Sequence, residues 1–241
     1  MLLSEMKLEV RDRLGETTEN FFKDTAILRA LNEGVRRFCY EDEWPWLQRV
    51  AATTLASAAE TFALTAEVDP NRQMILQFTP SAGDTRIREI KRVSTVQGEK
   101  LRVRYSGAGV VTDEPLYWYL RSSSVVAAYT VRVVPKADKA YTVAYVYYAA
   151  PVVLAVDADI PNIPEQYQMA AVHYAVANQW RKELSAGAKA QEEMMSYMQI
   201  LEAARKNTKS QAPDEMLVWG GIDPEYQFDA DWTRLHMPES L

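Results

Sequence analysis

The chain has 241 residues, which allows one large domain or two small ones with a proper core. It is 48% hydrophobic and 25% charged, and this composition is too apolar for a disordered chain. Acidic residues outnumber basic ones 33 to 27, so the net charge of -6 argues against a protein dedicated to binding nucleic acid.

Two helices are predicted within residues 1–48. The first follows Ser4 and ends at Gly15, and the second begins near Asp24. Gly34 lowers helix propensity inside the second helix, which suits a position where another helix approaches closely. The apolar stripes that support the two helices are Leu3, Met6, Val10 and Leu14, followed by Ile27, Leu31, Val35 and Phe38.

From about Val50 the hydrophobic pattern changes from helical to alternating. Short segments rich in Val, Ile, Thr and Tyr are separated by residues that favour turns. Short strands at such spacing predict an antiparallel sandwich or barrel, which we place at residues 49–150. The predicted strands are 54–64, 73–78, 86–96, 100–105, 116–120, 125–134 and 141–148.

Helical periodicity returns after Pro151, in residues 151–206. Pro164 suits the first turn of an alanine-rich helix that runs to about Leu184 and is apolar nearly all round, which predicts burial. A last helix is expected at about residues 189–206. Two N-terminal and two C-terminal helices then bracket the strands. The predicted fold is therefore α+β, a four-helix bundle with an inserted antiparallel β domain.

Residues 207–241 combine acidic charge with aromatic side chains. They hold two basic and seven acidic residues, and several prolines oppose long regular structure. A disordered tail that only adds solubility should contain few aromatic residues, so we expect an extended arm that orders on a partner. The alternative is that this segment folds back onto its own helices. The expected anchors are Trp219, Tyr226, Phe228 and Trp232.

Basic residues gather in residues 86–104, which hold seven basic and two acidic side chains. Lys100, Arg102 and Arg104 alternate with apolar or aromatic neighbours, so a strand would place all three cations on one face. A solvated face is the ordinary interpretation. The alternative is contact with an acidic partner surface, such as a neighbour's acidic tail, or with passing DNA.

Motifs of enzyme and metal sites do not occur in the sequence. His173 and His236 have no neighbour at metal-ligand spacing, and residues 107–109 are too short for a dinucleotide loop. Cys39 is the single cysteine and fits a small buried hydrophobe. We therefore expect no cofactor, no metal and no catalysis, with a cryptic site built from scattered polar residues as the alternative.

Membrane and export signals are not visible either. The longest nearly apolar run, residues 143–156, contains Pro151 and is shorter than the about 18 residues that a spanning helix needs. Charged side chains interrupt the first apolar residues, which excludes an obvious signal peptide. We expect a soluble protein made in a cytoplasm, with no membrane contact.

Several short stretches occur in a characteristic order: ALNEG at 30–34, WPWL at 44–47, EPLYW at 114–118, VP at 134–135, YVYY at 145–148 and DADIPNIPE at 157–165. Their order over about residues 1–206 resembles the head-to-tail adaptor (head-completion) proteins of tailed bacteriophages, including the tail tubular protein A-like group. The resemblance implies a ring, usually of twelve copies, that docks beneath the portal at the neck of the virion. It also implies tail or nozzle components below the ring and double-stranded DNA in its channel.

One other hypothesis stays open at this point. The β domain suits a ligand- or carbohydrate-binding module of a phage tail, with Trp118 and nearby tyrosines as the stacking residues.

Overall fold

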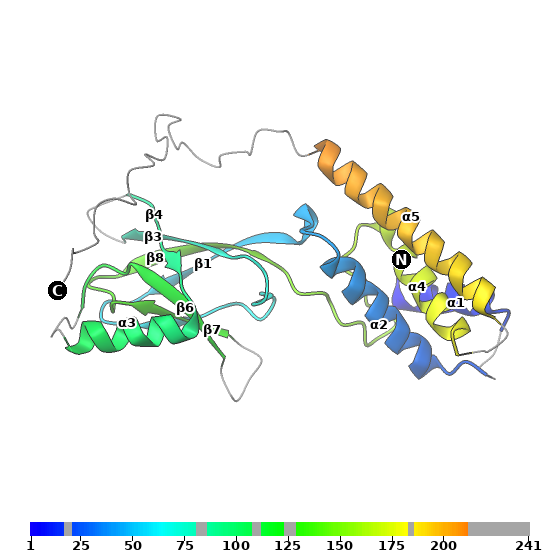
Figure 1. Ribbon diagram of the computed structural model, residues 1–241, viewed down its shortest axis with the longest axis horizontal. Helices are drawn as coiled ribbons and strands as arrows, with labels where there is room; N and C mark the ends of the chain where they lie inside the picture. The colour runs from blue at the N-terminus through cyan, green and yellow to red at the C-terminus, as the bar shows by residue number, and fades with distance from the viewer. Residues whose placement is uncertain (17–20, 81–85, 108–111, 123–128, 183–185, 212–241) are drawn as a thin grey trace, which may run out of the picture.

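The computed structural model describes residues 1–16, 21–80, 86–107, 112–122, 129–182 and 186–211. These residues form five α-helices and two four-stranded sheets, so the fold class is α+β. Figure 1 shows an elongated molecule in which the helices from the two ends of the chain lie together at one end, and both sheets lie with α3 (Thr95–Gly107) at the other.

The predicted four-helix bundle with a wholly antiparallel insertion and an arm from residue 207 is wrong. A fifth helix, α3 (Thr95–Gly107), occupies residues where strands were predicted. The short strand β5 (Lys91–Arg92) pairs in parallel with β6 (Tyr117–Ser122). Helix α5 (Gly187–Gln211) continues beyond residue 206 into the predicted arm. Pro213 explains a helix end near this point, because proline lacks the N–H that continues a helix.

At the helical end, α4 (Met169–Trp180) lies at the centre. It packs against α1 (Leu3–Leu14), α2 (Asp24–Tyr40) and α5. Its alanines are buried, which confirms the burial predicted from their number. A Cβ built on Gly34 of α2 would lie 3.0 Å from the carbonyl oxygen of Ala171, so the predicted close helix approach is also confirmed.

The β end consists of two sheets around a shared core. One sheet has the order β1–β8–β3–β4, and the other has the order β2–β7–β6–β5. In β8 the side chains alternate between buried and less buried positions, as a strand with one core face requires. The remaining strands are β1 (Gln48–Leu55), β2 (Thr61–Ala63), β3 (Ile75–Pro80), β4 (Arg88–Glu89), β7 (Tyr129–Val134) and β8 (Tyr141–Tyr148).

The two ends have separate hydrophobic clusters. Two short 3-10 helices, η1 (Pro45–Leu47) and η2 (Glu165–Tyr167), belong to the helical end. Arg72, from the segment between β2 and β3, joins the two ends of the molecule. Its guanidinium donates to the backbone carbonyl of Cys39, in the last turn of α2, and to that of Asp42, just after this helix. That the clusters are independent domains stays a prediction.

Candidate assembly surfaces

The described residues hold no group of three or more side chains that suits a metal ion. Burial raises the pKa of the Cys39 thiol to about 12, so this cysteine is a poor nucleophile. In the same part of the chain, no helix is both long and apolar enough to cross a bilayer. The features that remain are grooves and patches on the surface.

The predicted basic strand is a helix, so its three cations do not share one face. Residues two apart on a helix point about 200° apart, whereas those four apart lie on one side. Lys100 and Arg104 are therefore neighbours on the exposed side of α3, and both are exposed. Arg102 lies on a different side of α3 from Lys100 and Arg104, and its Nε donates to Glu99 Oε2 at 2.8 Å.

Glu99 is the centre of a polar network that holds α3 on the second sheet. Its Oε1 accepts hydrogen bonds from the Tyr119 hydroxyl at 2.9 Å and from Arg132 Nη1 at 3.1 Å. The hydrogen bonds from Arg102 and then Tyr119 lower the pKa of the Glu99 carboxyl. Burial raises the pKa of the Tyr119 hydroxyl, which stays a donor to this carboxylate. Arg102 thus has a structural role in this network.

The outer face of α3 is apolar on both sides of a lysine. Val96 is 68% exposed and Val103 is 64% exposed, and both line a groove of about 560 Å³ together with Lys100. This side of α3 therefore combines exposed apolar surface with a cation.

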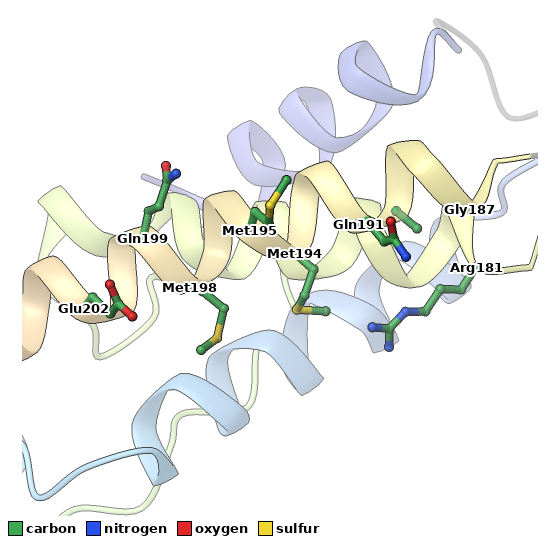
Figure 2. A pocket seen from close by; sticks show the side chains of 9 residues that line it. Arg181, Gly187, Gln191, Met194, Met195, Met198, Gln199 and Glu202 are labelled. Carbon is green, nitrogen blue, oxygen red and sulfur yellow. The ribbon is translucent and has the colours of Figure 1, made fainter.

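A larger groove of about 850 Å³ runs along α5, and we call it the methionine groove (Figure 2). Met195 is 60% exposed and Met198 is 42% exposed, while Met194 is partly buried against the helical core. Arg181 lies towards one end of the groove and Glu202 towards the other. By helical periodicity Met198 shares a face with Tyr197 and Leu201, which are buried, so the pattern alone does not reveal that Met198 is exposed.

A third apolar surface follows the segment after β8. Val152, Val153, Val156 and Ile160 are all exposed, and the first two line a groove beside α2. Arg29 and Arg36 lie on the α2 side of that groove. Exposed apolar residues concentrated in one segment are typical of protein contacts.

His173 makes a structural contact at the helical end. Its Nδ1 lies 2.6 Å from Glu193 Oε2, and the other oxygen of Glu193 lies 3.6 Å from Arg13 Nη1. This set joins α4, α5 and α1, and the sequence did not reveal Glu193 as the partner. His173 is therefore a packing residue at the interface between these helices.

Two other sequence predictions have different outcomes. Trp118 is 1% exposed and its Nε1 donates to the Ile90 carbonyl at 2.8 Å, so it is not accessible for stacking on a sugar. The predicted anchors of the arm lie outside the described residues and stay a prediction. They are Trp219, Tyr226, Phe228 and Trp232.

Exposed apolar residues gather at both ends of the molecule, as they do on proteins that bind other macromolecules. The chain belongs to the SU10 adaptor protein family, whose model matches residues 1–217. This confirms the resemblance to phage head-to-tail adaptors, and the chain is a structural adaptor of the bacteriophage virion. No curated protein matches the chain.

Proposed function

We propose that this adaptor forms a ring, with twelve copies as the expected number, between the portal and the tail of the virion. The ring surrounds a channel for double-stranded DNA and carries the tail or nozzle protein below. It has no catalytic role. The membership of residues 1–217 in an adaptor family carries this proposal, and the exposed apolar segments supply surfaces that neighbouring copies can bury.

Assembly on the portal is the direct test. The purified full chain is expected to be a monomer or weak oligomer alone, and to form a ring when the portal protein of the same phage is added. Native mass spectrometry gives the copy number, and negative-stain images show where the ring sits. A chain that stays monomeric in the presence of portal contradicts the proposal.

The arm is the proposed portal contact. Because α5 reaches Gln211, we now begin the arm at residue 212. Truncation after Gln211 is expected to abolish portal binding, while Trp219→Ala and Trp232→Ala each weaken it by about 30-fold, the equivalent of about 2 kcal/mol per buried anchor. A portal pull-down measures the loss, and a thermal melt of each variant is the control. Undiminished binding by a truncated chain that melts like the parent contradicts the arm's role.

The cations of α3 are proposed to contact an acidic partner or the DNA in the channel. Replacing Lys100 and Arg104 together by glutamine is expected to weaken ring formation or DNA retention several-fold at low salt, and less at high salt, where charges are screened. Arg102→Gln removes one cation from the same helix for comparison, and its thermal melt is measured as well because Arg102 pairs with Glu99 in the network that holds α3. Equal assembly and DNA retention of the double variant and the parent at low salt identify a solvated face.

A further inference from the structure

The methionine groove is an apolar face of α5 that nothing in the described residues covers. Figure 2 shows Met194, Met198 and Arg181 projecting to one side of this helix. Met198, Glu202 and Lys206 follow at successive steps of four residues and continue the same side towards the end of α5. Methionine side chains adapt to varied partners and make favourable contacts with aromatic rings, so the groove suits an aromatic occupant.

We propose that residues 212–225 of the same chain run back along α5 and cover the methionine groove in the free protein, with Trp219 on Met194 and Met198. The proposal rests on the proposed portal-binding role of the arm. In that role, the portal takes over the same tryptophan and uncovers the groove during assembly.

The reach of the segment supports this occupant. At 1.5 Å per residue, Met198 lies about 20 Å and Met194 about 26 Å before Gln211, the last residue of α5. In an extended chain, Trp219 lies up to about 26 Å beyond Gln211. The turn near Pro213 uses part of this length, so the chain brings Trp219 to Met198, and the indole extends from there towards Met194.

The charges along α5 are also complementary to those of the segment 212–225 when it runs back along this helix. The exposed Lys206 lies near the start of the segment, where Asp214 and Glu215 follow the reversal. Glu202 then faces the uncharged stretch 216–218.

The far end of the groove continues the match. Gly187 lies about 36 Å before Gln211 along α5, and Arg181 lines the groove beside it. In an extended chain Asp223 lies up to about 40 Å from Gln211, so Asp223 and Glu225 can lie beside Arg181. Opposite charges therefore meet at both ends, and apolar groups meet between them.

The test uses the full chain labelled with ¹³C at its methionine methyl groups. The ring current of Trp219 is expected to shift the methyl signals of Met194 and Met198 upfield in the dilute protein. Trp219→Ala should move both signals downfield, and that of Met198 to the position of an exposed methionine. The buried Met6 and Met74 are internal references and should not move. Trp232→Ala is the matched control, because Trp232 lies beyond the stretch that the groove accommodates.

Two outcomes overturn the proposal. Signals of Met194 and Met198 that do not respond to Trp219→Ala show that the segment does not cover the groove. Upfield shifts that appear only as the protein concentration rises show that a second copy is the occupant. Portal binding is measured separately, so a variant that loses portal binding without moving the methyl signals refutes only this proposal. A variant that moves the signals but binds portal normally refutes only the arm's docking role.

Discussion

Replacing Gly34 with valine is expected to lower the melting temperature by about 10 °C, because a loss of about 3 kcal/mol has roughly that effect in a chain of this size. A Cβ at this position lies 3.0 Å from the Ala171 carbonyl oxygen, 3.1 Å from its Cα and 3.2 Å from the Tyr174 Cβ. The first two are backbone atoms of the central helix α4, which cannot turn aside as a flexible side chain does. A thermal melt followed by circular dichroism measures the change.

Two glycine variants serve as controls for this prediction. Gly34→Ala adds one carbon and gains about 1 kcal/mol of helix propensity, which offsets part of the crowding, so its melt should change less. Gly187→Ala should be nearly neutral, since nothing lies within 4 Å of the added carbon. If Gly34→Val melts at the parent temperature, α2 and α4 do not pack as closely as described.

Local patterns predicted the parts of the fold that bury one continuous face. The apolar stripe of α2 and the alanines of α4 gave two helices, and Gly34 indicated where they meet. Strand β8 has the bounds that its alternation predicted, Tyr141–Tyr148. In each of these elements the hydrophobic period agrees with the tertiary environment, so the sequence alone is informative.

Helix α3 shows why the three cations were wrongly predicted to share one face of a strand. Lys100, Arg102 and Arg104 alternate with apolar residues, which is a strand pattern, yet tertiary contacts favour a helix. Gln97 N–H is 3.3 Å from the Ser94 hydroxyl at the helix start. A Cβ on Gly98 would fall 2.3 Å from the Tyr119 ring, so the lack of a side chain admits the ring. The cap at Ser94 is a local sequence signal that the strand interpretation overlooked, whereas the contact of Gly98 with Tyr119 appears only once β6 is placed beside α3.

The methionine groove was missed for a related reason. Met194, Tyr197, Met198 and Leu201 share a broad helical face, and periodicity does not show where the core boundary crosses it. In the structure Tyr197 and Leu201 are fully buried, whereas Met198 lies outside the boundary. Only the position of α4 and α2 around α5 fixes that boundary, and the sequence pattern contains no measure of it.

Arg72→Ala is expected to separate the two ends of the molecule. Arg72 stacks over the rings of Tyr40, from α2, and Tyr148, from β8, at 5.1 and 5.4 Å. Its Nε also lies 3.6 Å from Asp69 Oδ2, an oxygen with no hydrogen bond among the described residues. Asp69 is 2% exposed, so removing its cationic partner leaves a buried carboxylate uncompensated. Breaking such a pair costs about 3–5 kcal/mol.

The loss should appear as a change in cooperativity as well as in stability. Each end keeps its own hydrophobic cluster, so Arg72→Ala is expected to convert one unfolding transition into two and to lower the first midpoint by about 10 °C.

Arg72→Lys is the matched control. It keeps the charge near Asp69 but loses the fork of donors to the Cys39 and Asp42 carbonyls, so its effect should be intermediate. In the proposed ring each copy has to present both ends in a fixed orientation, so Arg72→Ala chains should form this ring less efficiently than the parent. A single transition at the parent midpoint would mean that backbone connections, and not Arg72, fix the orientation of the two ends.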